Sequence, residues 1–329
     1  MKYHLITFGC QMNKADSERM AADLERKGYQ KALKINEADL IVVNMCSVRQ
    51  SAVDRVFGLV PKLKELKTRT ILTGCILKKD RKKFENYFSQ IKKMPQRTCR
   101  SALIPISNGC NNFCSYCVVP FTRGRLVCRN HQEILKEVKR AIKGGFKEIW
   151  LLGQNVNDYI SEQKTENKKQ KINLAKLLKL VNNIPGDFSI RFMSPHPANF
   201  TDELIETMAK SKKVAKYLNL PVQSGDNKIL KKMNRPYSVG RYKELVKKIR
   251  KKIPDINLST DVIVGFPGET KKQFENTVKL FKEIKFNLAY IAKYSPRPGT
   301  AAFQMKNDVP IQEKKRREKV LRKLLKNSR

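Results

Sequence analysis

The sequence predicts an α/β protein in which a small parallel-sheet domain precedes a larger partial (βα) barrel of six units. Two observations lead to this prediction. Short apolar, β-branched runs alternate with helical stretches along almost the whole chain, an order typical of parallel sheets. The chain has 329 residues, 40% of them hydrophobic, which is enough for about two packed domains. We place the domains at 1–94 and 95–310, followed by a basic helix over 311–329.

The first domain repeats one pattern three times: a strand, then a cysteine, then a helix. Strands are expected at 3–8, 40–43 and 70–72, and helices at 16–28, 47–66 and 79–91, with Gly28 as a helix C-cap. The cysteines are Cys10, Cys46 and Cys75. Because the loops at the carboxyl ends of parallel strands form one ligand crevice, we expect the three thiols to converge. Each cysteine alone could be a small buried apolar residue, but three at equivalent strand ends favour a shared site.

A short polar connection over 95–100 leads to the second domain, where the alternation resumes on a larger scale. Strands are expected at 102–106, 148–152, 189–193, 217–222, 257–264 and 288–294, with a helix at 132–144. The site of such a barrel lies at the carboxyl ends of its strands. Small and polar residues gather at those ends, in the segments 153–155, 194–197, 223–225 and 265–269. His196 lies in one of them, and a hydrogen-bonded structural imidazole is at least as good an interpretation of it as a chemical role.

Two segments are strongly polar. Residues 161–171 contain no apolar side chain, and we expect them to form a solvated, mobile insertion. Residues 311–329 carry nine Lys or Arg against two Glu, with Val320, Leu321, Leu324 and Leu325 at helical spacing. This helix could close the core with a charged outer face, could track phosphates, or could do both.

The most specific motif is a loop with three thiols, Cys110, Cys114 and Cys117, four and then three positions apart. A structural zinc site takes four protein ligands, and a fully protein-ligated 4Fe-4S cluster takes four thiolates. Three thiolates therefore leave one iron open to a small molecule. The alternative is a zinc loop completed by His131 or by Cys128.

This loop, with the aromatic Tyr116 directly before its last cysteine, resembles the cluster loop of radical S-adenosylmethionine enzymes. The resemblance implies that the open iron binds the amino and carboxylate groups of S-adenosylmethionine, and that one electron cleaves it to a 5′-deoxyadenosyl radical. The cofactor then supplies the radical chemistry, and the protein positions it. The resemblance also implies a set of cofactor contacts. These are Tyr116 in the loop, Gly153 and Gln154 near the methionine amino group, Gln223 and Ser224 near the ribose, and Val264, Gly265 and Phe266 near the adenine.

The start of the chain indicates which group of radical S-adenosylmethionine enzymes the sequence resembles. Residues 7–13, Thr-Phe-Gly-Cys-Gln-Met-Asn, are similar to the start of the methylthiotransferases, and the segment 116–125 agrees with their tRNA-modifying members, the tRNA 2-methylthio-N6-dimethylallyladenosine synthases. The resemblance implies a second 4Fe-4S cluster held by Cys10, Cys46 and Cys75, and so two clusters in all. Cys99 and Cys128 match no ligand of the family, and we expect them to pack.

Two departures from the family pattern are visible. Cys75 and Cys110 are only 35 positions apart, so we expect an abbreviated amino-terminal sheet. Members of the family usually carry a small carboxy-terminal RNA-binding β-barrel, and the resemblance here covers about residues 1–325, where that barrel would begin. Without it, the basic radical domain would have to hold RNA alone.

Charge and composition suggest the partners and the compartment. The formal net charge of +39 favours a polyanion, although Lys-rich composition can also be ordinary solvated surface. No apolar run approaches the roughly 18 residues of a membrane span, and the first ten residues do not resemble a signal peptide. Eight cysteines fit metal ligands in a reducing cytosol better than disulfides. We expect a cytoplasmic monomer that binds the tRNA anticodon loop and a reductant protein such as a flavodoxin or ferredoxin, with no membrane contact.

The reaction that the resemblance implies is the addition of a methylthio group to carbon 2 of N6-isopentenyladenosine next to the anticodon. An anticodon loop suits this chemistry because proteins read RNA mainly in single-stranded loops, and chemistry on a base needs that base unstacked. Methylthiolation of threonylcarbamoyladenosine in tRNA, or of a ribosomal-protein aspartate, is an alternative within the same class. A non-catalytic metal-cluster RNA-binding protein is the alternative from another class.

Overall fold

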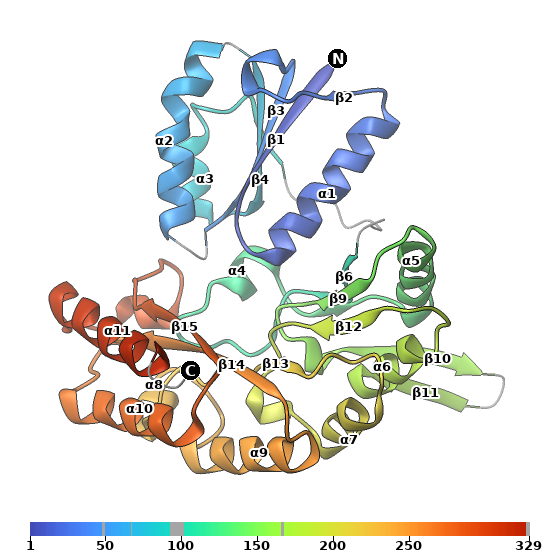
Figure 1. The fold of residues 1–329 in the computed structure, drawn as a ribbon. Helices are drawn as coiled ribbons and strands as arrows, with labels where there is room; N and C mark the ends of the chain where they lie inside the picture. The colour runs from blue at the N-terminus through green and yellow to red at the C-terminus, as the bar shows by residue number, and fades with distance from the viewer. Residues whose placement is uncertain (48–49, 67, 93–101, 166–167, 327–329) are drawn as a thin grey trace.

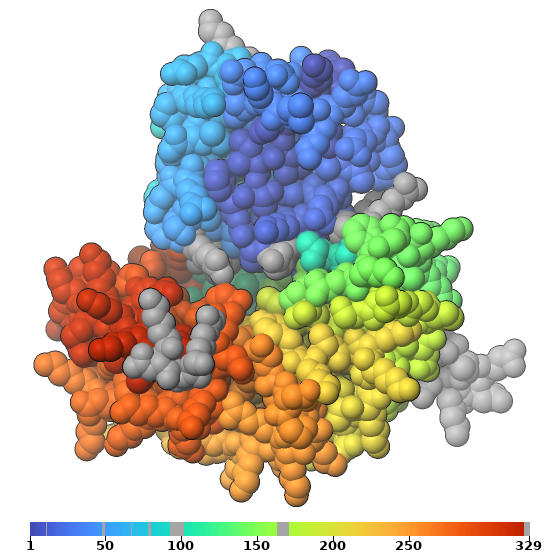
Figure 2. Space-filling view, viewed as in Figure 1, coloured from blue at the N-terminus to red at the C-terminus, as the bar shows by residue number. Residues whose placement is uncertain are grey.

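The computed structural model describes residues 1–47, 50–66, 68–92, 102–165 and 168–326. Figure 1 shows an amino-terminal domain built on a parallel sheet, in blue, above a partial barrel that runs from green to red. The space-filling view in Figure 2 shows the two parts in direct contact. The predicted α/β class, with a parallel-sheet domain followed by a partial barrel, is confirmed. The predicted polar connection over 95–100 lies outside the described residues.

The amino-terminal sheet has the strand order β2-β1-β3-β4-β5, and every neighbouring pair is parallel. Its elements are β1 (Lys2–Phe8), α1 (Gln11–Arg26), β2 (Gln30–Lys31), β3 (Leu40–Cys46), α2 (Gln50–Leu66), β4 (Arg69–Cys75), α3 (Lys78–Phe84) and β5 (Gln90–Ile91). Helix α1 covers one face, and α2 and α3 cover the other (Figure 1). Strand β3 is buried on both faces, as its continuous apolar run requires.

Two helix predictions in this domain are wrong at their ends. The first helix begins at Gln11 rather than Asp16, because Cys10 and Asn13 form a capping box that starts it five residues earlier. The third helix ends at Phe84, and Ile91 belongs to a strand instead. The backbone N–H of Ser89 donates to Thr70 Oγ1 at 3.0 Å, which ties the chain to β4 and directs it into β5.

The barrel is built from six parallel strands among the described residues, and each lies within a predicted strand. They are β6 (Leu103–Pro105), β9 (Glu148–Leu152), β12 (Ser189–Phe192), β13 (Tyr217–Asn219), β14 (Asn257–Val264) and β15 (Leu288–Lys293). They form two three-stranded groups, β6-β9-β12 and β13-β14-β15, linked by a single parallel bridge between Ile190 and Val214. The helices around them are α5 (His131–Lys143), α6 (Leu174–Asn182), α7 (Asp202–Lys210), α8 (Asn227–Lys232), α9 (Val239–Lys252) and α10 (Lys271–Ile284).

The insertion expected over 161–171 contains two paired strands. Strand β10 (Ile160–Thr165) pairs antiparallel with β11 (Lys168–Asn173). The hairpin is anchored at its base, where Ser161 and Ile172 are buried. The sequence pattern did not predict these strands, because a backbone ladder can order a polar segment once its ends are fixed, and the solvation and mobility of the insertion remain predictions.

The basic carboxy-terminal segment is helix α11 (Ile311–Lys326). Leu321 is fully buried, and Val320, Leu324 and Leu325 pack against the barrel core, so the interpretation as a closing helix is confirmed. Lys314 and Arg317 are also buried, at 3% and 2% exposure, which the sequence pattern did not predict.

The two domains contact each other through α1 and the strands β6 and β9. Met12 and Ala15 of α1 form an apolar cluster with Leu152, and Trp150 packs at its edge. The short helix α4 (Val119–Arg123) lies at the same junction, beneath the amino-terminal sheet (Figure 1). Across the described ranges, no helix is long and apolar enough to span a membrane.

Candidate active site

The three clustered cysteines lie in the thiol loop, residues 109–118, between β7 (Ser107–Asn108) and α4. Cys110 and Cys114 are each 9% exposed, and Cys117 is half-buried. Burial raises the pKa of Cys110, and it raises the pKa of Cys117 to about 12. These two thiols are therefore protonated near neutral pH in the free protein, so that a metal must displace their protons when it binds.

The thiol loop is held by a segment far away in sequence, the turn at 232–235. Ser115 Oγ donates to the carbonyl of Lys232 at 2.8 Å, and the Ser115 N–H donates to the carbonyl of Met233 at 3.0 Å. Asn234 Nδ2 donates to the carbonyl of Phe113 at 3.0 Å. The loop thus has a fixed shape before any cofactor binds, which is the preorganisation that a metal site requires.

Arg235, in the same turn, is the functional candidate that sequence reasoning missed. Its side chain donates to Cys114 Sγ at 3.6 Å, to the carbonyl of Pro221 at 2.9 Å and to Tyr237 Oη at 2.9 Å. The residue is only 7% exposed. Burial alone would lower the pKa of Arg235, but the charges of Tyr116, Tyr237 and Cys114 raise it overall. A permanent cation therefore lies beside one of the three thiols.

Two of the predicted cofactor residues share one apolar cluster. Phe266 is fully buried against Ile229, Met233 and Tyr294, and Tyr116 packs on the same group. Residues 150 positions apart in the sequence thus meet between the thiol loop and the end of β14. Such a cluster can form one apolar wall of a nucleoside pocket.

The turn after β9 lies directly against the thiol loop. Gln154 Oε1 accepts a hydrogen bond from the Gly109 N–H at 2.7 Å. A Cβ on Gly153 would lie 2.6 Å from Ser107 Oγ, so a larger residue there would displace the Ser107 side chain. The structure therefore brings this predicted pair to the loop, although the Gln154 carbonyl oxygen is engaged by the protein itself.

The other predicted residues also lie at the carboxyl ends of barrel strands. Gln223 has a positive φ of 68°, and its backbone bridges to Val262 of β14. Ser224 is fully buried, and its Oγ accepts from the Asp226 N–H at 3.2 Å. Val264 ends β14 and is also fully buried. These positions flank the same strand-end surface as the thiol loop.

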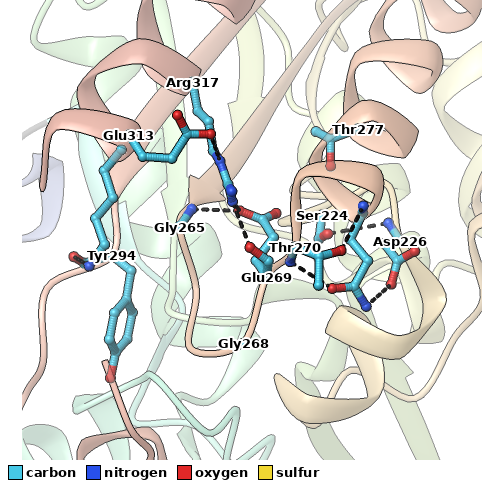
Figure 3. A network of polar contacts seen from close by, with 12 residues as sticks. Ser224, Asp226, Gly265, Gly268, Glu269, Thr270, Thr277, Tyr294, Glu313 and Arg317 are labelled. Atoms are coloured by element: carbon cyan, nitrogen blue, oxygen red, sulfur yellow. Dashed lines mark hydrogen bonds and ion pairs between the residues drawn. The ribbon is translucent and has the colours of Figure 1, made fainter. Parts of the chain in front are cut away.

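A buried polar network supports the turn after β14 (Figure 3). The Gly265 N–H donates to Glu269 Oε2 at 2.6 Å, and Arg317 of α11 forms an ion pair with the same carboxylate at 2.7 Å. Arg317 also pairs with Glu313 at 2.9 Å. A Cβ on Gly265 would lie 2.4 Å from Lys314 Cγ. Helix α11 therefore packs directly on the predicted adenine-side turn.

The second set of thiols lies at the carboxyl edge of the amino-terminal sheet. Cys46 and Cys75 are register partners on β3 and β4. A hydrogen bond with Cys46 and burial both raise the pKa of Cys75. Cys10 follows the neighbouring strand β1, is exposed, and donates from Sγ to Asn13 Oδ1 at 3.4 Å. The strand order 2-1-3-4-5 reverses direction between β1 and β3, and ligands bind at such switch points.

The structure brings Cys46 and Cys75 into contact, whereas the sulfur of Cys10 is directed to Asn13. Within the described ranges, no three His, Cys, Asp or Glu side chains are arranged for a single metal ion. A multi-iron cluster binds each thiolate through a different iron, so it does not require that arrangement. Cys128 packs against the barrel core and accepts a hydrogen bond from the Ile160 N–H at 3.4 Å. Cys99 lies outside the described residues.

Two cavities of about 400 Å³ each open elsewhere on the barrel. One lies among α8, α9 and α10. Gly225 lines it, but none of the predicted cofactor residues does. The other is lined by the turn that contains Asn234 and Arg235. Neither cavity is lined by any of the six predicted cysteine ligands, so the candidate site rests on the donor chemistry of the thiols rather than on a cavity.

Comparison with known families assigns both halves of the chain. Residues 104–281 match the radical SAM superfamily, and residues 2–94 match the uncharacterized protein family UPF0004. The first match covers the thiol loop and most of the barrel, and the second covers Cys10, Cys46 and Cys75.

Similar proteins share most of this chain. A tRNA-2-methylthio-N(6)-dimethylallyladenosine synthase of Clostridium botulinum (strain Hall) is 39% identical over 96% of this chain and 79% of its own length. A protein of the same name from Thermoanaerobacter sp. (strain X514) is 40% identical over 93% of this chain and 74% of its own length. Among solved structures, the radical S-adenosylmethionine methyltransferase TsrM from Kitasatospora setae aligns with a TM-score of 0.62 at 13% identity, over 92% of this chain and 75% of TsrM. That structural likeness supports the fold alone.

Proposed function

The chain belongs to the radical S-adenosylmethionine methylthiotransferases, and from that membership we propose that it adds a methylthio group to carbon 2 of N6-isopentenyladenosine next to the anticodon of tRNA. The family uses S-adenosylmethionine and a 4Fe-4S cluster. The observation that carries the proposal is the presence of two sets of three thiols on either side of one domain junction. A single cluster would need only one of these sets.

The thiol loop fits the first cluster by its donor chemistry. Cys110, Cys114 and Cys117 offer three thiols in one preformed loop, and Arg235 supplies a buried positive charge beside Cys114. A cluster bound by three thiolates carries negative charge, so a buried cation offsets the electrostatic cost of burying it. These three cysteines would hold the cluster and leave one iron open for the methionine end of the cofactor.

The strand ends fit S-adenosylmethionine along one side of the loop. Gly153 and Gly265 stand where a Cβ would collide with Ser107 and Lys314 respectively, so these glycines let the protein's own side chains pack closely against the strand ends. Tyr116 and Phe266 would form the apolar wall against the adenine. Gln223, Ser224 and Gln154 are the polar groups of the surrounding turns.

The amino-terminal thiols would hold a second 4Fe-4S cluster through Cys10, Cys46 and Cys75. When bound, the two clusters and S-adenosylmethionine supply the radical chemistry, the sulfur and the methyl group. The protein's task is to keep the target base between the two thiol sets and away from water. Apolar packing at the junction, including Met12 and Leu152, excludes water from one side of that space.

The RNA partner of this proposal is the anticodon loop of tRNA, whose unstacked bases can enter such a site. Phe121 is 56% exposed beside the thiol loop, and the Arg125 guanidinium lies 4.8 Å from the centre of the Phe113 ring. Exposed aromatic and guanidinium groups are the side chains on which single-stranded bases stack. The proposal also includes a flavodoxin or ferredoxin as reductant and a monomeric protein in the reducing cytoplasm, where the thiols remain available for iron.

The alternatives are less well supported. The relatives are named for dimethylallyladenosine rather than for threonylcarbamoyladenosine or a ribosomal-protein aspartate. A non-catalytic RNA-binding protein would not explain the 39% identity to a protein named as a tRNA-2-methylthio-N(6)-dimethylallyladenosine synthase over 96% of this chain.

The test separates the two thiol sets. Cys114→Ala should abolish cleavage of S-adenosylmethionine, because a methyl group cannot replace the thiolate of the open-site cluster. Cys46→Ala should keep that cleavage but lose methylthio insertion. Both variants would be reconstituted anaerobically with iron and sulfide and assayed for 5′-deoxyadenosine and, by nucleoside mass spectrometry, for the modified adenosine in tRNA.

Unchanged 5′-deoxyadenosine formation by Cys114→Ala would refute the role of the thiol loop. If Cys46→Ala formed the methylthiolated nucleoside at the parental rate, Cys46 would be a buried core residue and not a cluster ligand. Iron analysis of the parent protein should find about eight iron atoms per chain for two 4Fe-4S clusters.

A further inference from the structure

Arg123 connects the two thiol sets physically. It is the last residue of α4, which lies at the junction of the domains (Figure 1). Its side chain is 9% exposed, although it belongs to a helix with no fully buried residue. A charged side chain that is desolvated at a domain junction needs specific partners, and those partners show its role.

The guanidinium of Arg123 contacts three separate segments. Nε donates to Cys75 Sγ at 2.9 Å, one terminal nitrogen donates to Asp16 Oδ2 at 3.0 Å, and the other donates to Asn108 Oδ1 at 2.9 Å. Cys75 and Asp16 belong to the amino-terminal domain, and Asn108 lies two residues before Cys110. Only a planar group with several fixed donors can satisfy three acceptors in this way, so lysine is not equivalent here.

The acceptor carboxylate is itself fully buried. Asp16 has no exposed side-chain surface, and its other oxygen pairs with Arg19 of the same helix. Removing one member of a buried ion pair leaves an uncompensated charge, which costs far more than removing a surface pair. The Arg123–Asp16 pair therefore fixes the orientation of α4 relative to α1.

A second arginine of the barrel lies close to the same edge of the amino-terminal sheet. Arg297 is 6% exposed and donates to Gln50 Oε1 of α2 at 2.8 Å. Burial lowers the pKa of Arg297, while the nearby charges of Asp80 and Cys46 raise it. The register partners Cys46 and Cys75 thus each lie within the electrostatic range of an arginine from the other domain.

We propose that Arg123 is a positioning residue for methylthio transfer: it fixes the Cys75 sulfur relative to the thiol loop and donates a hydrogen bond to that sulfur when Cys75 ligates the second cluster. The proposal rests on the proposed function, because a fixed separation matters only if both thiol sets act on one substrate. Hydrogen bonds to ligand sulfurs raise the reduction potential of iron–sulfur clusters. Arg123 therefore sets both the geometry and the potential of the second site.

The experiment compares Arg123→Gln and Arg123→Lys with a matched control, Arg129→Gln. Arg129 forms a partly buried pair with Glu137 at 2.7 Å, and both residues lie within the barrel domain. Arg129 also donates to the carbonyl of Pro105 in β6 at 2.6 Å, so the control removes a comparable ion pair whose partners both belong to the barrel domain. Each change is made in the parent chain and in a chain whose Cys110, Cys114 and Cys117 are alanine, so that only the second cluster can form.

Three measurements are made on the full-length protein. In the alanine background, the midpoint potential of the remaining cluster should fall with Arg123→Gln, fall less with Arg123→Lys, and stay at the parental value with Arg129→Gln. In the parent background, both Arg123 variants should form more 5′-deoxyadenosine per methylthiolated nucleoside. In the metal-free protein, hydrogen exchange of α1 should rise with Arg123→Gln and not with Arg129→Gln.

The proposal is overturned if Arg123→Gln matches the control in midpoint potential and in the ratio of 5′-deoxyadenosine to product. Loss of iron from both Arg123 variants, with the control intact, would also overturn it in favour of a purely structural role. A parent protein that holds iron but makes no methylthiolated nucleoside would refute the proposed function instead. The midpoint potential and the exchange of α1 would then still test Arg123.

Discussion

At the scale of single residues, two glycines with the same φ have different reasons to be glycine. Gly109 and Gly124 both have a φ of 82°. A Cβ on Gly109 would lie 2.1 Å from the backbone oxygen of Arg125, whereas a Cβ on Gly124 would meet nothing within 4 Å. Gly109 is therefore required by close packing inside the thiol loop, and Gly124 only by its φ.

This pair yields a prediction for iron binding. Gly109→Ala should displace the thiol loop, because a backbone atom cannot move aside, and the reconstituted protein should lose the iron held by that loop. Gly124→Ala also places a side chain at a positive φ, at a cost of about 1–3 kcal/mol, but without the collision, and it should retain its iron. Iron and sulfide analysis measures the difference, and equal iron content in the two variants would contradict it.

His196 yields a prediction for pH. It is 4% exposed, its Nδ1 accepts from the Ala198 N–H at 3.3 Å, and burial together with the Arg235 charge lowers its pKa to about 3. The unfolded chain takes up the proton at a pKa of about 6.5, so the folded state loses stability as the pH falls from 6.5 towards 3. Between pH 7 and pH 5, this residue should account for about 2 kcal/mol of the decrease in the free energy of unfolding.

The measurement is urea unfolding of the metal-free protein and of His196→Asn at both pH values. Asparagine can cap the same short turn without titrating. The free energy of unfolding of the variant should therefore decrease by about 2 kcal/mol less than that of the parent on acidification. Equal decreases would show that the folded protein can protonate His196, and would reopen the chemical role that the sequence left as an alternative.

At the scale of helices and strands, the sequence predicted the bounds of elements whose apolar residues are buried in the core. Strand β9 was predicted at its observed bounds, because its apolar residues Ile149, Leu151 and Leu152 are all buried in the core. The errors lie where one or two contacts determine where a helix begins or ends. A cap at Cys10 starts α1, and hydrogen bonds between Ser89 and Thr70 direct the chain into a strand where a helix was predicted. Such contacts join residues whose pairing the sequence pattern does not show.

Helix α11 also depends on a contact that the sequence pattern does not show, and this contact yields a further prediction. Its apolar stripe was visible in the sequence, but the burial of Arg317 depends on Glu269, which lies 48 positions away. Arg317→Met should leave the Glu269 carboxylate buried and unpaired, at a cost of about 3–5 kcal/mol. The control is Arg322→Met on the same helix, where a largely exposed pair with Glu318 contributes at most about 1 kcal/mol.

Unfolding by urea, followed by the fluorescence of Trp150, the only tryptophan of the chain, reports on the barrel directly. The Arg317 variant should also bind S-adenosylmethionine more weakly, because Glu269 accepts the N–H of Gly265 in the predicted adenine-side turn. If Arg317→Met and Arg322→Met unfolded at the same urea concentration, the network in Figure 3 would not anchor the helix.

At the scale of the whole molecule, topology explains which parts of the site the sequence could predict. Parallel sheets place all strand ends on one edge, so the approach of Cys46 to Cys75 follows from the order of elements. Contacts between domains do not follow from it. Arg235 and Arg123 reach thiols 121 and 48 positions away, and no periodicity indicates such pairs.

The net charge of +39 leads to a prediction about RNA binding that the structure makes specific. Lys314 and Arg317 are buried and bonded to the protein, so they cannot contact phosphate. The exposed cations on the same helix include Lys315, Lys319 and Lys323. Replacing these three with Gln should weaken tRNA binding and flatten its salt dependence by roughly one power of salt concentration for each lysine–phosphate pair that the substitutions remove.

The control distinguishes a defined RNA surface from diffuse charge. Lys247, Lys251 and Lys282 are likewise exposed, but they lie on α9 and α10, around the outside of the barrel (Figure 1). Replacing them with Gln changes the net charge by the same amount, so any purely long-range effect should be equal in the two triple variants. A larger decrease in affinity and a flatter salt slope for the α11 variant would place RNA against that helix. If the two variants bound tRNA alike, α11 would be only a closing helix, and the RNA surface would have to be sought at Arg125 beside the thiol loop.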